Sequence, residues 1–244
     1  MNKIEKLAEI IKSSNNTVFF GGAGVSTESG LKDFRSKDGL YYEKYQYPPE
    51  EILSHHFFIN HPTEFYEFYK NKLNSLNYKP NKAHTVLADL EEKGLLKAII
   101  TQNIDGFHQI SGSKNVIELH GSILRNYCMK CKKSYNAKEV FTAKDIPKCS
   151  CGGIIKPDVV LYEENLDKTN LEKAIQYISA AEVLIIGGTS LNVYPAAGLI
   201  NYFKGNYLVL INQEKTPYDK KCNLIIYDSI GKVLEKTKEY IEKR

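Results

Sequence analysis

Four of the five cysteines form two closely spaced pairs that suit a metal ion. The first pair has the spacing C-x2-C, seventeen residues follow, and the second pair has the spacing C-x-C. Thiolate pairs on tight turns are typical ligands of tetrahedral zinc, with Zn–S bonds of about 2.3 Å. The ligands of this predicted site are Cys128, Cys131, Cys149 and Cys151, whereas Cys222 stands apart and is predicted to be a passive residue.

The predicted zinc site is structural and not catalytic. No histidine or further acid lies at ligand spacing, and four thiolates leave no open position for a substrate. The surrounding segment has little apolar core of its own, so the metal would supply its folding energy. The alternative is four unrelated buried cysteines.

A glycine-rich turn follows an apolar run in the stretch FFGGAGVSTESGLKDFRS, residues 19–36. Glycines at such a place let backbone N–H groups approach a diphosphate, although a tight turn would use them as well. Arg35 can neutralise a phosphate and Phe34 can cover a ring. No acidic residue ends the next predicted strand, which argues against a dehydrogenase that transfers hydride.

Two further polar motifs, TQNID and ELHG, also follow apolar runs. Gln102, Asn103 and Asp105 are costly to bury without a ligand or a polar network, and they suit ribose hydroxyls and a carboxamide. The alternative is a helix start that Asp105 caps. His120 is placed where a general base near neutral pH is useful. The other five histidines have no comparable setting.

The elements that must position these residues are short runs rich in Val, Ile and Leu. Such runs predict strands at residues 17–20, 96–104, 115–121, 157–162, 182–190, 206–214 and 223–229. Helical patterns cover residues 4–11, 171–181 and 196–203. This alternation predicts an α/β fold, a mostly parallel sheet with helices on both faces. Ligands bind beyond the carboxyl ends of such strands, and five polar motifs follow strands directly, so one large site is expected.

Two segments, residues 39–78 and 125–156, interrupt this alternation, the first with an aromatic-rich helical pattern and the second with the cysteines. The net charge of +4 is spread over separated lysines, which indicates a solvated surface and not a nucleic-acid site. No apolar run approaches the ~20 residues of a membrane span. The first fourteen residues carry acids and lack a cleavage site, so a cytoplasmic location is expected.

Seven motifs in order, GAGVSTESGLKDFR, TQNIDGFH, ELHG, the cysteine pairs, IKPDVVLYEE, GGTSLNVYPAA and INQE, resemble the sirtuin family of NAD-dependent protein lysine deacylases. The resemblance covers about residues 16–229. It implies a Rossmann-like, doubly wound parallel sheet with a small zinc-ribbon and helical module. The implied NAD-binding domain spans residues 1–38, 81–124 and 157–244. The implied small domain combines a helical module at 39–80 with a zinc-binding module at 125–156.

The resemblance also implies roles for single residues. The implied NAD-binding residues are Gly22, Ala23, Gly24, Thr27, Asp33, Phe34, Arg35, Gln102, Asn103, Ile104, Asp105, His120, Gly188, Thr189, Ser190, Asn212, Asp228 and Ile230. An extended substrate peptide would add as a strand between two segments. Its implied contacts are Val159, Val160, Leu161, Tyr162, Leu191, Asn192 and Val193.

The implied reaction consumes NAD. The acyl oxygen of a modified lysine attacks the anomeric carbon of the nicotinamide ribose, and nicotinamide leaves. His120 then takes a proton from a ribose hydroxyl, which attacks the resulting imidate, and water completes the release of free lysine and an O-acyl-ADP-ribose. The implied partners are acyl-lysine proteins or peptides, and a monomer with one structural zinc and no nucleic-acid ligand is expected. A mono-ADP-ribosyltransferase on the same scaffold and a regulatory binding protein built on the zinc module are the alternatives.

Three departures from the family pattern concern the substrate. Lys32 stands where proline is usual, and LYEE replaces the commoner FGE ending. Succinyl-specific members carry a Tyr-x-x-Arg pair, whereas here Lys44 stands three residues after Tyr41. Neutral acyl groups, acetyl first, are therefore favoured, and the aromatic residues nearby leave longer apolar chains open.

Overall fold

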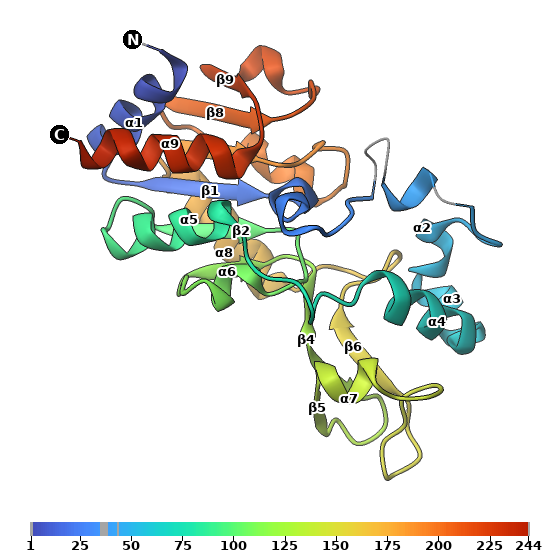
Figure 1. Cartoon of the computed structure of the whole chain (residues 1–244). Helices are drawn as coiled ribbons and strands as arrows, with labels where there is room; N and C mark the ends of the chain where they lie inside the picture. Colours follow the sequence, from blue (N-terminus) through green and yellow to red (C-terminus); the bar gives the residue numbers. More distant parts are fainter. Residues whose placement is uncertain (1, 35–38, 43, 244) are drawn as a thin grey trace.

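The chain folds around a six-stranded parallel sheet with the order β3-β2-β1-β7-β8-β9. The computed structural model describes residues 2–34, 39–42 and 44–243 (Figure 1). The strand order reverses between β1 and β7, which makes their carboxyl ends the topological switch point of the sheet. The strands are β1 (Thr17–Gly21), β2 (Ala98–Thr101), β3 (Val116–Glu118), β7 (Val183–Gly187), β8 (Tyr207–Asn212) and β9 (Leu224–Tyr227).

Helices cover both faces of this sheet (Figure 1). On one face, α1 (Lys3–Ser13), α5 (Lys82–Glu92) and α9 (Ile230–Glu242) share a core with Phe19 of β1. On the other face, α8 (Lys168–Ala180) and the 3-10 helix η4 (Ala196–Tyr202) pack against Phe20. Strands buried on both faces need apolar side chains throughout, which is why they appear in the sequence as continuous apolar runs. The predicted α/β fold is confirmed.

A smaller unit lies beyond the sheet and combines helices with a three-stranded antiparallel sheet of order β5-β4-β6 (Figure 1). An apolar core that includes Phe57, Phe65 and Tyr69 joins the helices of this unit to its three-stranded sheet. No helix among the described residues is long and apolar enough to cross a membrane. The elements of this unit are α2 (Pro49–Ile52), α3 (His55–Asn60), α4 (Pro62–Lys72), β4 (Gly121–Cys128), β5 (Ser134–Asn136), α7 (Ala137–Phe141) and β6 (Ile155–Val159).

The prediction that residues 157–162 continue the parallel pattern is wrong. They overlap β6, which pairs antiparallel with β4. The chain turns out of the large sheet at Gly121, where φ is +75° and a Cβ would lie 2.0 Å from the carbonyl oxygen of Asp158. Only glycine allows that close approach, and it starts β4, a strand that the sequence pattern does not predict beyond its first residue.

Five predicted strands were also too long, and for two of them the difference concerns the site. β2 ends at Thr101 and β7 at Gly187, so the residues after them form loops at the carboxyl edge of the sheet. A short helix, α6 (Phe107–Ile110), follows β2. The loop after β1 contains two single-turn 3-10 helices, η1 (Ala23–Val25) and η2 (Thr27–Ser29). Two more single turns are η3 (Leu40–Tyr42) and η5 (Asp219–Lys221).

Candidate functional site

The turns after β1 and β7 pack backbone against backbone at the switch point. The N–H of Gly24 donates to the carbonyl of Gly188 at 2.8 Å, and the N–H of Gly22 donates to that of Gly187 at 3.2 Å. A Cβ on Gly24 would lie 2.8 Å from the Cα of Gly188, whose own φ is +56°. Side chains are excluded there, so only glycines allow the two turns to pack this closely, with Gly22 and Gly188 buried and Gly24 half-buried.

Ala23 and Thr27 lie in the same turn. Ala23 begins η1 and is partly exposed. The Thr27 hydroxyl donates to the carbonyl of Gly24 at 3.0 Å, so this side chain braces the glycine turn from within. Sequence reasoning placed both residues in the site, and the structure brings them to the carboxyl edge of β1.

Gln102 joins the ends of three strands. Its backbone N–H donates to the carbonyl of Gly21 at 3.0 Å, at the end of β1. Its side-chain amide donates to the hydroxyl of Thr189 at 3.2 Å, just after β7. Its carbonyl accepts from Nδ1 of His120 at 2.9 Å, just after β3. Three predicted site residues therefore meet in one place, as the parallel sheet requires.

The hydrogen bond to Gln102 determines the tautomer of His120. A carbonyl oxygen only accepts, so Nδ1 carries the proton and Nε2 holds the lone pair of the neutral ring. Burial lowers the pKa of His120 below its ordinary value, and the hydrogen bond to the Gln102 carbonyl opposes part of that shift. The imidazole is thus neutral at pH 7 and can accept a proton at Nε2.

A buried polar network connects Asn103 and Asp105, which follow Gln102 in the chain, to residues of two other segments. The Ser26 hydroxyl donates to Oδ2 of Asp105 at 2.7 Å and accepts from Nδ2 of Asn103 at 3.1 Å. Nε2 of His84 lies 3.4 Å from the same hydroxyl. The N–H of Asn81 donates to Nδ1 of His84 at 3.1 Å, so the proton of that ring is on Nε2 and points to Ser26.

Burial shifts the titration of two members of this network. It raises the pKa of Asp105, against hydrogen bonds from the N–H of Phe107 and the hydroxyl of Ser26. It lowers the pKa of His84 to about 4. Oδ1 of Asp105 also accepts from the N–H of Phe107, the first residue of α6, at 2.9 Å, although the N-cap of that helix is Gly106 and not Asp105 as the alternative predicted. A buried carboxyl with a raised pKa suits the recognition of a neutral carboxamide.

Ser26 and His84 are functional candidates that sequence reasoning missed. Ser26 belongs to the glycine-rich motif, in which a serine by itself predicts no role. His84 is the third residue of α5, where Nδ1 of its ring accepts from the N–H of Asn81 in a capping box, an ordinary local role at a helix start. The packing of α5 against the glycine turn brings this ring to Ser26 and Asp105, and no local sequence pattern predicts that contact.

The loop after the glycine turn carries Asp33 and Phe34. The carbonyl of Asp33 accepts from the N–H of Leu40 at 2.9 Å. The Phe34 ring packs edge-on against Tyr41 with centroids 5.7 Å apart, and it also contacts the core of the smaller unit. Arg35, the remaining predicted residue of this loop, lies outside the described residues.

Ile104 lies between the large sheet and the smaller unit. Its carbonyl accepts from the N–H of Ile123 at 2.9 Å, and its side chain packs partly buried against the core of the smaller unit. The segment that follows β2 therefore contacts β4 at Ile104, where β4 leaves the large sheet.

The predicted adenosine-side residues are at the ends of β7, β8 and β9. Ser190 is partly exposed after β7, and Nδ2 of Asn212 donates to the carbonyl of Glu214 at 2.7 Å. Asp228 pairs with Lys232 at 2.7 Å. Ile230 is different, because its side chain is buried in the core and packs on the end of β7. Its side chain therefore belongs to the packing of α9.

The two predicted peptide segments both connect to the His120–Gln102 pair. The N–H of Val160, next to the buried Val159 and Leu161, donates to the carbonyl of His120 at 3.0 Å. On the other side, the N–H of Leu191 donates to the Thr189 hydroxyl at 3.2 Å, and Leu191 has a left-handed φ of 57°. The rest of this second segment is Asn192, which is exposed, and Val193, which is half-buried.

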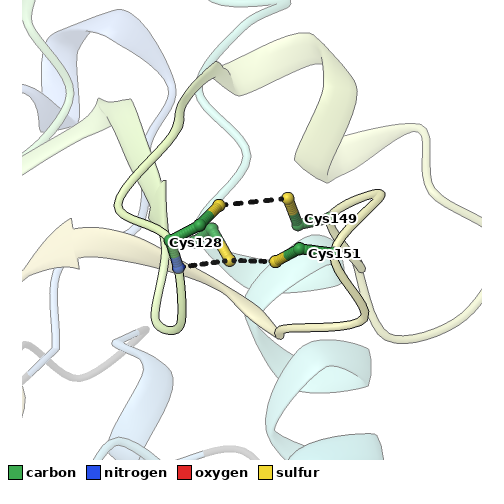
Figure 2. A group of neighbouring side chains, drawn as sticks. Cys128, Cys149 and Cys151 are labelled. Carbon is green, nitrogen blue, oxygen red and sulfur yellow. Dashed lines mark hydrogen bonds between the residues drawn. The ribbon is translucent and has the colours of Figure 1, made fainter.

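The four predicted metal ligands come together. Their sulfur atoms all lie within 4.8 Å of one another, and Cys128 Sγ is 3.4 Å from Cys151 Sγ. Figure 2 shows Cys149 and Cys151 on one loop facing Cys128. Tetrahedral zinc with bonds of about 2.3 Å holds its sulfurs about 3.8 Å apart, so this donor set fits the ion. The site is in the smaller unit, and the shorter C-x-C pair does not prevent the ligands from converging.

Comparisons with known proteins agree on one family. Residues 22–195 match the model described as the Sir2 family. An NAD-dependent protein deacetylase of Clostridium perfringens is 63% identical over 96% of this chain and 98% of its own length. The protein of that name from Clostridium acetobutylicum is 59% identical, with the same coverage.

Two solved structures have similar folds. A structure described as Sir2-p53 peptide-NAD+ has a TM-score of 0.85, 40% identity, and coverage of 99% of this chain and 98% of its own. Another holds Sir2 with a deacetylated p53 peptide and 3'-O-acetyl ADP ribose. Its TM-score is 0.91, at 40% identity and 98% coverage of both chains.

Proposed function

The chain belongs to the Sir2 family and is an NAD-dependent protein deacetylase, and from this premise we propose which of its residues carry out the reaction. The observation that carries the proposal is the hydrogen bond from Nδ1 of His120 to the carbonyl of Gln102. It leaves Nε2 as the basic nitrogen of a neutral ring, beside the glycine turns where the strand ends meet.

NAD is a substrate that supplies an electrophilic ribose carbon and nicotinamide as a neutral leaving group. We propose that the glycine turns at Gly22, Gly24 and Gly188 receive its diphosphate, with Ala23 and Thr27 beside it. Phe34 and Arg35 are assigned to the nicotinamide ribose, together with Gln102, and Asp33 is assigned to brace their loop. The residues assigned to the adenosine half are Thr189, Ser190, Asn212, Asp228 and the backbone of Ile230.

Asn103, Ile104 and Asp105 are proposed to hold the nicotinamide ring. The hydrogen bond from Ser26 keeps Oδ2 of Asp105 in place, and His84 and Asn103 in turn orient the Ser26 hydroxyl. A carboxyl anchored in this way accepts from a carboxamide N–H without having to reorganise.

His120 is proposed to act as the general base. Its Nε2 takes the proton of a ribose hydroxyl, and the Gln102 carbonyl stabilises the imidazolium that forms because Nδ1–H already donates to it. The lowered pKa keeps the ring unprotonated before this step.

The substrate peptide is proposed to add as a strand between residues 159–162 and 191–193. Cys128, Cys131, Cys149 and Cys151 would hold one structural zinc, which stabilises the smaller unit and takes no part in the chemistry.

The finer organisation is also a proposal. Residues 1–38, 81–124 and 157–244 would form the NAD-binding domain, and residues 39–80 and 125–156 the small domain. We propose a cytoplasmic monomer that acts on acyl-lysine proteins, with neutral acyl groups preferred and no nucleic acid as a direct ligand.

The test is to mix the zinc-loaded protein with NAD and an acetyl-lysine peptide. Nicotinamide and free lysine are expected in equal amounts, and His120→Ala should abolish release of free lysine. His56→Ala, an exposed histidine on α3, is the matched control and should retain activity. Release of nicotinamide without loss of the acyl group would indicate ADP-ribosyl transfer instead. No deacylation by the wild type across several acyl lengths would overturn the proposal.

A further inference from the structure

A pair of tyrosine hydroxyls bridges two segments to which the proposed function assigns different substrates. Oη of Tyr41 and Oη of Tyr162 are 2.6 Å apart, a hydrogen bond in which either atom can donate. Tyr162 belongs to the LYEE sequence that departs from the family pattern. Tyr41 follows the loop that carries Phe34. The hydrogen bond between these tyrosines therefore involves a residue, Tyr162, in a segment where this chain departs from the family pattern.

The backbone of Tyr162 is held on the side of the smaller unit. Its N–H donates to the carbonyl of Leu53 at 3.0 Å, and its carbonyl accepts from the N–H of His55 at 2.9 Å. Ser54 and Tyr162 accordingly form a parallel β-bridge. Because both backbone groups are engaged, the phenol ring extends from a fixed point of the proposed peptide segment.

Tyr41 is joined in a similar way to the proposed nicotinamide-ribose loop. Its N–H donates to the carbonyl of Phe34 at 3.0 Å. Its ring meets the Phe34 ring edge-on, with centroids 5.7 Å apart. A displacement of Phe34 is therefore expected to move Tyr41, and the hydrogen bond between the two hydroxyls transmits this movement to Tyr162.

We infer that the Tyr41–Tyr162 hydroxyl pair couples the binding of the two substrates, so that each improves the binding of the other. This inference rests on the proposed function, which assigns Phe34 to NAD and Tyr162 to the peptide. Coupling between two sites is reciprocal, so the same factor must appear in both affinities. The tyrosines are positioning residues, and neither is needed for proton transfer.

The test is a double-mutant cycle with Tyr41→Phe, Tyr162→Phe and the double variant. The affinity for an acetyl-lysine peptide is measured by calorimetry with and without ADP-ribose, and the ratio of the two dissociation constants is the coupling factor. Each single variant should lower that factor about fivefold, the change expected for one neutral hydrogen bond. The double variant should lower it no further, because the pair is already broken in each single variant.

Tyr207→Phe is the matched control. Tyr207 is exposed to a similar degree, 38% against 37% for Tyr162, and stands at the amino end of β8, away from the carboxyl edge. Its coupling factor should equal that of the wild type. The melting temperature of every variant is recorded, since a merely structural role would lower stability and leave the coupling factor unchanged.

The outcomes separate this inference from the proposed function. An active wild type with no coupling, or with single variants that keep the wild-type factor, overturns the inference alone. Additive losses in the double variant also overturn it, because they show that the two hydroxyls act independently. A wild type that does not deacetylate overturns the proposed function and the inference with it.

Discussion

Replacing the buried His108 by phenylalanine is expected to reduce the acid sensitivity of the fold. His108 is 1% exposed on α6 and packs against the rings of His84 and Phe19, with centroids 4.9 and 6.3 Å away. Within the described part of the chain, neither of its ring nitrogens has a hydrogen-bond partner. Burial, with a smaller contribution from His84, lowers its pKa to about 3.

The sign of the effect follows from proton linkage. The unfolded chain binds a proton at His108 with a pKa of about 6.5, whereas the folded chain does so only near pH 3. The stability that this neutral ring contributes is therefore complete above about pH 6.5 and is lost as the pH falls. Between pH 7 and pH 5 the loss is about 2 kcal/mol for His108. His84, with its pKa lowered to about 4, adds a loss of similar size.

Phenylalanine has a ring of similar size and no group that titrates. We expect His108→Phe to be close to the wild type in stability at pH 7 and to lose about 2 kcal/mol less between pH 7 and pH 5. The assay is urea unfolding at several pH values with zinc present throughout. Subtracting the variant from the wild type removes the contribution of the cysteine ligands, which both proteins share.

His56→Gln is the control for removing a histidine from an exposed position on α3. Its pH dependence should follow that of the wild type. If His108→Phe loses as much stability between pH 7 and pH 5 as the wild type does, the buried imidazole is not the source of the acid sensitivity, and the reasoning fails.

Three other predictions concern the site and the metal. In Gly24→Ala the new Cβ would lie 2.8 Å from the Cα of Gly188. The variant should therefore have a KM for NAD raised at least about tenfold, measured by steady-state kinetics, and a free energy of unfolding lowered by about 1–3 kcal/mol, measured by urea unfolding. Removing zinc with a chelator should unfold the smaller unit and abolish deacetylation, and restoring zinc should recover both, as followed by circular dichroism. The acid limb of the kcat/KM profile should have a pKa below 6.5, because burial holds the His120 pKa down; a limb above 6.5 would contradict the assignment of this base.

Much of the candidate site followed from the sequence because of one property of parallel sheets. Residues that directly follow the strands must gather at one edge, whatever the lengths of the connections. This is why the sequence alone predicts that Gly24, Gln102, His120 and Thr189 lie together. The cysteine pairs were equally readable, because each pair lies on a tight turn and only the meeting of two pairs depends on tertiary structure.

The tertiary structure decided what depends on contacts between residues distant in sequence. His84 joins Ser26 and Asp105 only because α5 packs beside the glycine turn, and its local sequence is that of an ordinary helix start. The pairing of β6 with β4 depends on the turn at Gly121, and the tautomer of His120 depends on one carbonyl of Gln102. The local periodicity of the sequence predicts which residues are buried and which form helices or strands. These other features arise only when separate elements come into contact and their buried polar groups form hydrogen bonds with one another.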